Sequence, residues 1–391
     1  MRHLSWMVVV CLLLSGCGGL TSMMDKLGEP KTDEEGEKIA PAVLVDFMQE
    51  VQLSKRWSTH AVGKYRSVNG GIRPAAMNGT IYVADSNGQV AAVDTASGQE
   101  QWKVELDVTI GGGVGVGGNL VLIGSAEGDV FALDAATGEQ RWHTYVTSEV
   151  LAAPGTNGNV VVVQSQDGRV VGLDADNGEK LWLFEADVPV LTLRGTSSPI
   201  VGYDKVIVTF ANGKVHALSP QNGSELWENR VAIPQGRTEL ERMVDIDGQP
   251  ARAGDVLYVA SYQGRVGALA RSTGRGIWYQ DASTTHDLAY SLEQVYLVQK
   301  NDAVKALRAS SGQQLWLNEQ LTYRKLSSPV VLSGYLVVAD AEGYVHVLSL
   351  TDGRFMARTK VGAGVTAPML VDGNVLYVLD NGGGLTAFSI E

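Results

Sequence analysis

Cysteine is almost absent from this chain. Its 391 residues include two cysteines, Cys11 and Cys17, both close to the N-terminus. No pair of cysteines remains beyond residue 17, so no internal disulfide is expected in the rest of the chain. The six histidines are scattered, without a spacing such as H-x-x-x-H that would indicate a metal site. Stability therefore has to come from packing, and we expect neither a metal nor another cofactor.

Clusters of basic residues are missing as well. The net charge is −12, which makes nucleic acid and anionic membrane surfaces poor candidates as partners. The apolar run WMVVVCLLL, residues 6 to 14, is far shorter than the ~20 residues that a spanning helix needs. The hydrophobic content of 45% and charged content of 19% are those of a globular protein. The length fits one large β domain or two smaller ones.

The N-terminus has the pattern of an export signal. Arg2 supplies a short basic region, the apolar run follows, and the tetrapeptide LSGC ends at Cys17. This tetrapeptide resembles the lipobox of bacterial lipoproteins, which implies cleavage before Cys17 and attachment of lipid, including palmitate. The alternative is an ordinary signal peptide with a stray cysteine. We therefore expect a signal peptide at 1–16 and a lipidated flexible tether at 17–45. By the same resemblance, the absence of an aspartate next to Cys17 implies the outer membrane as location.

Beyond the tether the chain repeats itself. The block EGDVFALDAATGEQRW, residues 127–142, is similar to residues 87–102 and 167–182, and degenerate copies bring the total to eight. The glycine before the tryptophan position recurs at residues 98, 138, 178, 223, 274, 312 and 353. A period near forty, built of short alternating runs, predicts four strands per repeat, which is the signature of a β-propeller blade.

The residues of the block have clear structural roles. The pair Asn87-Gly88 tolerates positive φ and suits a two-residue hairpin. Asp94 precedes a turn that ends in glycine, where its carboxylate is expected to accept backbone N–H bonds. The small residue at the position of Ala92 leaves room for a large neighbour, and the recurring tryptophans such as Trp102 are the candidates. Only one copy, at Val347, has a larger residue there.

The ends of the chain predict how the ring closes. The last copy stops before its tryptophan strand, whereas Trp57 lies before the first hairpin and has no repeat of its own. We predict that the strand around Trp57 completes the last blade, which closes the ring and removes free sheet edges. The expected fold is an all-β, eight-bladed β-propeller of four-stranded antiparallel blades over residues 46–391. The segment AVLVDFMQEVQL, residues 42–53, is compatible with a short helix or an extended arm.

Two resemblances follow from these motifs. The segment LDAATGEQRW, which ends at Trp142, resembles the PQQ-type repeat of quinoprotein dehydrogenases, and the match to that repeat covers about residues 57–391. A shared repeat specifies a fold and not a reaction. The combination of lipobox, tether and propeller with LTLRG (residues 191–195) and DIDGQP (residues 245–250) more closely resembles the BamB family, lipoprotein subunits of the β-barrel assembly machinery (BAM complex) of Gram-negative bacteria.

The second resemblance implies a function. It implies a non-catalytic scaffold on the periplasmic face of the outer membrane, which binds the POTRA domains of BamA and assists the folding and insertion of β-barrel proteins. Other BAM lipoproteins would be indirect partners. Direct pairing of nascent barrel strands with an outer blade edge is a weaker hypothesis.

Two insertions interrupt the repeat. Trp142 and Pro154 are twelve positions apart, whereas Trp182 and Pro199 are seventeen apart, and the tryptophan at 227 and the proline at 250 are twenty-three apart. Both insertions occupy the same position in adjacent repeats, so both loops are expected side by side on one face. Insertions on one face of a repeat protein often mark its binding surface.

The insertions contain the candidate partner-binding residues. Leu191 and Leu193 share a side if their segment is extended, and Arg194 adds directional hydrogen bonds to this apolar pair. Asp245 and Asp247 in the second insertion either pair with basic groups of a partner or hold Arg194 in position. By the resemblance, these five residues match the BamA-binding loops. The structural alternative is that the leucines fold into the core and the aspartates cap turns.

Other functions find less support in the sequence. The run GGGVGVGGN, residues 111–119, is followed by another strand pattern rather than a helix, so we expect an innermost strand and not a nucleotide-binding loop. His216 and His346 share one repeat position, which indicates a structural or solvent-facing place. A PQQ-dependent dehydrogenase remains an alternative, although no set of calcium ligands is assignable and the vicinal disulfide of such enzymes is not possible here. A generic envelope scaffold with another partner is the third hypothesis.

Overall fold

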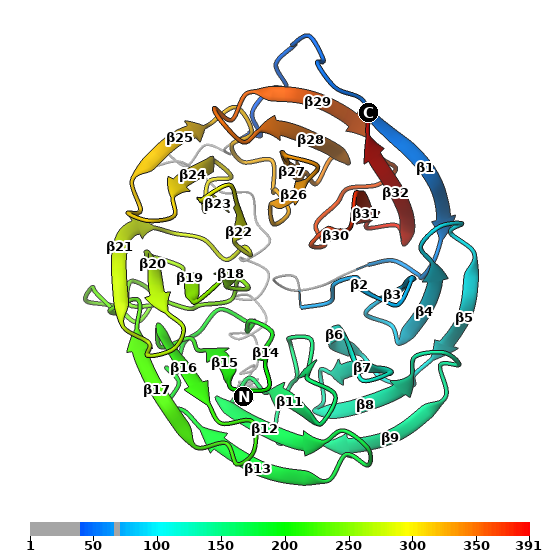
Figure 1. Cartoon of the computed structure of the whole chain (residues 1–391), viewed down its shortest axis with the longest axis vertical. Coiled ribbons are helices and arrows are strands. Elements are labelled where there is room, and N and C mark those ends of the chain that lie inside the picture. The colour runs from blue at the N-terminus through cyan, green and yellow to red at the C-terminus, as the bar shows by residue number, and fades with distance from the viewer. Residues whose placement is uncertain (1–39, 66–70) are drawn as a thin grey trace, which may run out of the picture. The chain divides into compact units, whose positions relative to one another are not determined.

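Eight four-stranded antiparallel sheets form a ring, and the chain passes once around it (Figure 1). The computed structural model describes residues 40–65 and 71–391. In seven sheets the strands follow chain order from the centre of the ring to its rim, and the eighth has the order β1-β32-β31-β30. The predicted all-β, eight-bladed propeller of four-stranded antiparallel blades is confirmed.

The blades are numbered by the position of their inner strand in the chain. Blades 1 to 4 consist of β2 (Ala75–Met77), β3 (Thr80–Ala84), β4 (Gln89–Asp94), β5 (Glu100–Glu105); β6 (Ile110–Gly117), β7 (Leu120–Ser125), β8 (Asp129–Asp134), β9 (Gln140–Tyr145); β10 (Gly155–Thr156), β11 (Val160–Gln164), β12 (Arg169–Asp174), β13 (Lys180–Glu185); β14 (Ile200–Val201), β15 (Val206–Thr209), β16 (Lys214–Leu218) and β17 (Glu225–Arg230). Blades 5 to 8 consist of β18 (Ala251–Ala253), β19 (Val256–Ala260), β20 (Gly264–Ala270), β21 (Gly276–Ala282); β22 (Ala289–Ser291), β23 (Gln294–Val298), β24 (Val304–Arg308), β25 (Gln314–Asn318); β26 (Val330–Leu332), β27 (Tyr335–Ala339), β28 (Tyr344–Ser349), β29 (Phe355–Lys360); β30 (Leu370–Asp372), β31 (Val375–Leu379), β32 (Gly384–Ile390) and β1 (Leu53–His60).

The hydrophobic core lies between the blades. The second strands are sandwiched between neighbouring sheets, and all five residues of β3 and of β11 are buried on both faces. Outer strands differ, because in β5 only Trp102 is buried while its neighbours Gln101 and Lys103 face solvent. This gradient explains why the second strands are continuous apolar runs and the outer strands alternate.

The first and last strands close the ring as predicted. β1 pairs antiparallel with β32, with Leu53 opposite Ile390 and His60 opposite Gly384. Trp57 lies opposite Ala387 in this register. Blade 8 therefore combines strands from the beginning and the end of the propeller sequence. This pairing closes the ring.

The turn before the outer strand has the predicted chemistry in blades 1 to 3. A carboxylate oxygen of Asp94 accepts the backbone N–H groups of Ala96 and Ser97 at 3.1 and 2.8 Å. Gly98 then adopts φ 72°, a left-handed conformation that a residue without a Cβ adopts at little cost. Two further aspartates make the same pair of bonds in their own blades, Asp134 and Asp174.

The recurring tryptophans join each blade to the next one. The indole N–H of Trp102 donates to the carbonyl of Ala135 in blade 2 at 3.0 Å. A Cβ placed on Gly138 would lie 2.7 Å from the ring of Trp102, so the ring covers this turn closely. Ala92 lies opposite Trp102 within blade 1, which confirms that the small residue makes room for the tryptophan. The same contacts recur at six other tryptophans: Trp57, Trp142, Trp182, Trp227, Trp278 and Trp316.

Blade 7 departs from this pattern for a topological reason. Ala357 occupies the tryptophan position, and Val347 lies opposite to it. In this blade the outer strand β29 therefore carries the small residue and β28 the larger one. In blade 8 the corresponding turn is interrupted, because Gln52 and Glu391 meet there and exchange backbone hydrogen bonds of 3.1 and 3.0 Å. A tryptophan at 357 would find no turn glycine to cover. The exceptional valine in the repeat is thus a consequence of ring closure.

Residues 42–52 form an extended arm along the outside of blade 7. No residue of this arm is helical, so the extended alternative holds. Phe47 stacks on Phe355 with ring centroids 5.2 Å apart, and the guanidinium of Arg358 lies over both rings. The backbone N–H of Glu50 donates to the carbonyl of Met356 at 2.9 Å. These contacts use the backbone groups of the arm, which removes the reason to form a helix.

A buried chain of polar groups in blade 7 holds the arm. Arg324 donates through Nε to Asp340 at 2.7 Å and through Nη1 to the carbonyl of Ala42 at 2.9 Å. His346 Nε2 lies 3.0 Å from Asp340, and His346 Nδ1 accepts the Nε–H of Arg358 at 3.1 Å. Since an arginine Nε always carries a hydrogen, the proton of the neutral imidazole is on Nε2. His346 is fully buried, so of the two expected places, structural or solvent-facing, it has the structural one. Burial also lowers its pKa.

The glycine-rich run forms the innermost strand of blade 2, as predicted. β6 contains most of this run and leads directly into β7. A Cβ on Gly115 would lie 1.9 Å from the carbonyl oxygen of Pro154 in blade 3, so glycine is required where the two backbones approach each other. Among residues 40–65 and 71–391, no helix is long and apolar enough to cross a membrane.

Candidate protein-docking site

Two neighbouring connections between blades contain the insertions that interrupt the repeat. The first loop, residues 186–199, links β13 of blade 3 to β14 of blade 4. The second loop, residues 231–250, links β17 of blade 4 to β18 of blade 5. Each runs from an outer strand to the inner strand of the following blade, so both lie on the same face of the ring, as the repeat position predicted.

A hydrogen bond joins the two loops directly. The carboxylate of Asp245 in the second loop accepts the backbone N–H of Leu193 in the first. Arg194, the next residue, is exposed, and its Nη2 lies 4.0 Å from Glu149 Oε1 in the connection between blades 2 and 3. The bond to Asp245 therefore fixes the backbone immediately before the exposed arginine.

The two aspartates differ from the expectation that they face a partner. Asp245 is fully buried and Asp247 is 3% exposed. Val244 and Ile246, which alternate with them, are buried as well, so both sides of this segment lie inside the fold. A direct contact with basic groups of a partner is not compatible with this burial. The other role expected from the sequence, positioning of Arg194, fits better. Asp245 does this through the backbone beside Arg194, however, and not through its guanidinium.

Burial also changes the acidity of this pair. It raises the pKa of Asp245 to about 7, although the bond from Leu193 opposes the effect. Burial raises the pKa of Asp247 well above its usual range, and the charge of Asp245 adds to that rise. Asp245 Oδ1 and Asp247 Oδ2 have no hydrogen-bond partner within the described part of the chain. Burial thus disfavours the charged form of both carboxyl groups at this junction.

The leucines of the first loop occupy different environments. Leu191 is 39% exposed, whereas Leu193 is half-buried at the junction with the second loop. Gln166 donates to the hydroxyl of Thr192 at 3.2 Å and to the carbonyl of Leu193 at 3.4 Å. The structure thus presents Leu191 and Arg194 to solvent and uses Leu193 to anchor the loop.

The bases of both loops are fastened through blade 4. Thr209, at the end of β15, donates to the carbonyl of Ile246 at 3.0 Å, and its hydroxyl lies 2.7 Å from that of Ser197. Asn212 in the following turn donates to the carbonyl of Asp187 at 2.6 Å. These contacts connect both ends of the first loop and the buried part of the second loop to one blade, so the two loops form one surface.

Sequence reasoning missed the exposed part of the second loop. Residues 235–242 are all exposed, and they include the apolar Leu240. The signal was present as Thr238 followed by Glu241, the spacing of a helix-capping box, but no apolar periodicity accompanied it. The exposed character of this segment follows only from its fold.

One histidine lies in a cluster with two carboxylates on blade 4. His216 Nδ1 is 2.7 Å from Glu225 Oε2, and His216 Nε2 is 3.9 Å from Glu228 Oε2. Lys214 pairs with Glu228 at 2.8 Å. Because the carboxylates face opposite nitrogens of one ring and a lysine already neutralises one of them, the arrangement is an ion-pair cluster. Burial lowers the pKa of His216, which places this residue in a structural role too.

The centre of the ring contains a bridge between distant blades. Arg73, before β2, pairs with Asp287, before β22, at 2.9 Å. Asp287 also accepts the backbone N–H of Gln249 at 2.8 Å. Arg73 and Gln249 contribute to the lining of a cavity of about 360 Å³ beside blades 2 to 4. The two charges of this bridge are thus paired within the protein.

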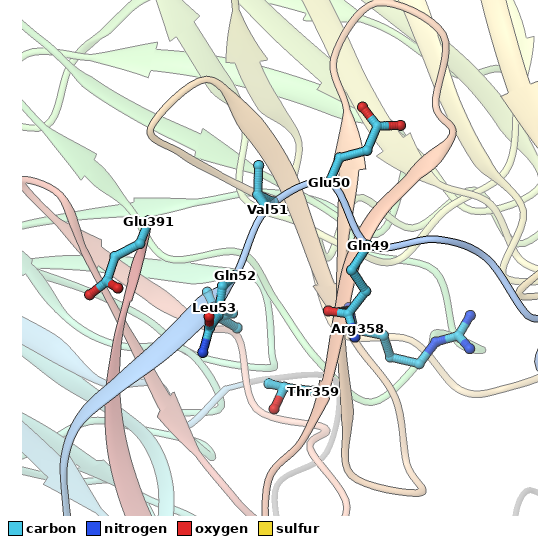
Figure 2. Close-up of a pocket in the computed structure, with 8 residues that line it drawn as sticks. All are labelled: Gln49, Glu50, Val51, Gln52, Leu53, Arg358, Thr359 and Glu391. Atoms are coloured by element: carbon cyan, nitrogen blue, oxygen red, sulfur yellow. Dashed lines mark hydrogen bonds between the residues drawn. The ribbon is translucent and has the colours of Figure 1, made fainter.

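A second cavity lies where the arm crosses blades 7 and 8. It measures about 600 Å³ and is lined by Gln49, Glu50, Val51, Gln52, Leu53, Arg358, Thr359 and Glu391. Figure 2 shows that the guanidinium of Arg358 points away from Glu391 and from Glu50. Its bonds to the carbonyl of Val45 and to His346 explain this orientation. The cavity therefore has polar walls without a cation aimed into it.

Solved structures share the fold of this chain. The crystal structure of BamB from Moraxella catarrhalis superposes with a TM-score of 0.80 at 29% identity and covers 86% of this chain and 100% of that chain. Quinohemoprotein alcohol dehydrogenase from Comamonas testosteroni superposes with a TM-score of 0.67 at 15% identity, over 86% of this chain and 76% of that one. The latter similarity shows the propeller fold alone.

Sequence comparison identifies the family. The family model described as "Outer membrane protein assembly factor BamB" matches residues 50–110, 86–318 and 300–391. Outer membrane protein assembly factor BamB of Pseudomonas aeruginosa is 51% identical over 356 residues, which cover 91% of this chain and 94% of that protein. The chain therefore belongs to the BamB family of outer membrane protein assembly factors.

Proposed function

We propose that this chain is a non-catalytic scaffold subunit in the assembly of outer membrane β-barrel proteins, and that its first and second loops bind the periplasmic POTRA domains of BamA. The observation that carries the proposal is the junction of Asp245 with Leu193, which turns two insertions of a BamB-family propeller into one surface. Leu191 and Arg194 are the exposed contact residues of this surface, and Leu193, Asp245 and Asp247 position them.

The rigidity of the loops supports a docking role. Association costs less when the contact residues are already ordered, because no loop entropy is lost on binding. Bonds from Gln166, Thr209 and Asn212 hold the loops in place before any partner arrives. An apolar side chain beside an arginine is the composition that interface hot spots favour.

The proposed location follows from the N-terminus. Cys17 and residues 1–39 lie outside the described residues, so the lipid anchor remains a proposal based on the lipobox. A lipid at Cys17 would confine the propeller to the periplasmic face of the outer membrane and raise its effective concentration near membrane-bound partners. Other BAM lipoproteins would then be indirect partners, and nascent barrel proteins would be clients.

Two alternative functions make different predictions. A PQQ-dependent dehydrogenase would acquire a bound chromophore after addition of PQQ and Ca²⁺, which absorbance detects. A generic envelope scaffold would co-purify with a protein other than BamA. The names of the relatives, which are assembly factors, favour the first proposal over both.

Calorimetry tests the proposed function. Residues 40–391 would be titrated with isolated POTRA domains of BamA, in parallel with a Leu193→Ala/Arg194→Ala variant of verified fold. We expect binding by the parent protein and loss of binding by the variant. Equal binding by both would keep the partner and move the site, whereas no binding by the parent would reject BamA as the partner.

A further inference from the structure

The outer strand of blade 6, β25, is an edge strand without charge. It ends its sheet and lies at the rim of the ring (Figure 1). Each of the other seven outer strands contains at least one charged side chain, whereas β25 has the sequence QLWLN. Charged residues on an edge strand hinder its pairing with a further strand. β25 therefore lacks this protection of its edge.

Two leucines of β25 are open to solvent. Leu315 and Leu317 are 37% and 38% exposed, while Trp316 between them is buried. Among residues 40–65 and 71–391, no backbone group outside the sheet bonds to the backbone of β25. Two apolar side chains at a spacing of two residues and a free edge are thus available in the same strand.

A lysine without an ionic partner lies beside these leucines. Lys305 in β24 is directly opposite Leu317, and directly opposite residues of an antiparallel pair project to one face. Its side chain is partly buried, and no hydrogen bond or ion pair reaches its ammonium group within the described residues. Burial lowers the pKa of Lys305, because it disfavours the charged form. A carboxylate brought to this group would offset the cost of burying the charge.

Two other blades have a polar residue at this position of the repeat and give it a polar partner. In blade 4, His216 lies opposite Glu228. In blade 7, His346 lies opposite Arg358 and accepts its Nε–H at 3.1 Å. In blade 6 the opposite residue is a leucine, so the outer strand supplies Lys305 with no partner.

Blade 7 shows how an extended segment covers an outer strand. Met356 in β29 corresponds to Leu315 in β25, since each precedes the tryptophan position of its blade. The backbone N–H groups of Glu50 and Val51 in the arm donate to the carbonyl of Met356, which is only 7% exposed. Within the described residues no such bond covers Leu315. An extended chain is thus an occupant that an outer strand of this propeller accepts.

We infer that the β25 surface, made of Lys305, Leu315 and Leu317, binds an extended peptide strand with apolar side chains at alternate positions and a carboxylate beside them. The strand adds to the free edge of β25 through backbone hydrogen bonds, its apolar side chains cover the two leucines, and its carboxylate pairs with the lysine. The identity of the occupant rests on the proposed function: it is a strand of a β-barrel protein before insertion, because such strands alternate apolar and polar residues.

Fluorescence anisotropy with the full chain and labelled synthetic peptides tests this inference. The probe is a peptide of about ten residues, the length of one barrel strand, in which Val alternates with Thr and Asp. One control peptide has the same composition in scrambled order, and a second has Asn in place of each Asp. We expect the parent protein to bind the scrambled peptide at least about tenfold more weakly than the alternating acidic one.

Two variants of the β25 surface separate its apolar and charged parts. Leu315→Ala/Leu317→Ala should weaken binding of the alternating acidic peptide at least about tenfold, because the apolar anchors are lost. Lys305→Met keeps an apolar stem and removes the charge. It should weaken binding of the acidic peptide about fivefold and leave binding of the Asn peptide unchanged.

Blade 3 offers the matched control. β13 has the same Leu-Trp-Leu order, and its leucines Leu181 and Leu183 are 52% and 39% exposed. Its edge, however, contains Lys180 and Glu185. We therefore expect Leu181→Ala/Leu183→Ala to bind the peptide as the parent does. Circular dichroism checks that each variant is folded.

Three results would overturn the inference. They are absence of peptide binding by the parent, equal binding by the parent and Leu315→Ala/Leu317→Ala, and an equal loss in the β13 control, which would assign binding to exposed leucines in general. Binding of phosphatidylglycerol vesicles in place of the peptide, if it is lost in Leu315→Ala/Leu317→Ala, would assign the surface to lipid and reject a peptide occupant.

Titration of the same proteins with POTRA domains of BamA distinguishes this inference from the proposed function. No substituted residue lies in the first or second loop, so every variant should bind POTRA domains as the parent does. Loss of peptide binding with intact POTRA binding would reject the β25 surface alone. Peptide binding by a parent that does not bind POTRA domains would keep the β25 surface and reject BamA as the partner of the loops.

Discussion

The carboxylate of Asp245 accepts the backbone N–H of Leu193, which lies 52 residues earlier in the chain. This bond ties the first loop to the second and buries an acidic group that the sequence alone would place on the surface. The proposed docking face therefore depends on a buried residue. A substitution at this position acts through the loop beside it.

The first prediction concerns the pH dependence that Asp245 causes. The pKa of Asp245 rises from 3.8 to about 7 on folding, so the folded protein binds a proton that the unfolded chain releases between these values. The free energy of unfolding accordingly falls as pH increases from about 4 to about 7. The shift corresponds to at most about 4 kcal/mol. Asp245→Asn keeps an acceptor for Leu193 but cannot ionise, so we expect it to be more stable than the parent at pH 8 and similar at pH 4.

Urea denaturation at several pH values measures this difference. Asp281→Asn on the exposed surface of β21 serves as the control, and its stability should follow that of the parent. An Asp245→Asn variant that loses stability with pH as steeply as the parent would show that Asp245 does not titrate in this way.

The second prediction concerns the contact between each tryptophan and the next blade. Gly138→Ala places a Cβ about 2.7 Å from the ring of Trp102 and also keeps the unfavourable positive φ of 75°. Gly254→Ala is the matched control, since φ is 57° there and no atom lies within 4 Å of the new Cβ. We expect about 1 kcal/mol of destabilisation at Gly254 and clearly more at Gly138. Thermal unfolding measures both, and equal losses would mean that the ring contact contributes nothing.

The third prediction concerns the arm on blade 7. Phe47→Ala removes the ring that stacks on Phe355 and lies beneath Arg358, so the arm should open more often. Hydrogen exchange at Glu50 and Val51, whose N–H groups donate to Met356, should become faster. The control is Val43→Ala, because Val43 is 87% exposed. Unchanged exchange in Phe47→Ala would indicate that the arginines alone hold the arm.

The fourth prediction concerns acidification. The pKa of His346 is lowered by burial, so the unfolded chain binds a proton near its usual pKa of 6.5 before the folded protein does. Stability is therefore lost as the pH falls below about 6.5. The groups that face this ring are Asp340, Arg358 and Arg324, and protonation of Nδ1 would break the bond from Arg358. His346→Gln can still bond both neighbours and should lose less stability between pH 7 and pH 5.

Chemical denaturation at pH 7 and pH 5 tests this prediction, with the exposed His60→Gln as control. The parent and His60→Gln should show the same loss on acidification. A His346→Gln variant with an equal loss would assign the pH dependence to another group.

Some details of the fold were readable from single residues. Trp57 without a repeat of its own predicted the strand that closes the ring, and Val347 marked the blade where the tryptophan is missing. These predictions succeed because each repeat has the same local chemistry, so any departure from it stands out. The reason for the departure at Val347 still required the structure, which shows that Gln52 pairs with Glu391 in the next blade in place of a turn.

The candidate site was harder to predict in detail. Leu191 and Arg194 are exposed as a docking surface requires, but Asp245 and Asp247 are buried and Leu240 is exposed, against the usual preference of each residue type. The sequence around Asp245 is compatible with a solvent-facing loop. Only the approach of Leu193 from the adjacent loop shows why an aspartate is kept inside.

The sequence by itself determined the propeller, its closure and the place of the two insertions, because period, turn chemistry and strand alternation depend on residues close together in the chain. The tertiary structure alone decided which side chains of those insertions meet solvent. Burial and exposure there depend on contacts between segments that lie far apart in sequence, such as Leu193 with Asp245 and Leu240 with Gln263. No local pattern encodes such contacts, since their energy exists only when both segments are in place.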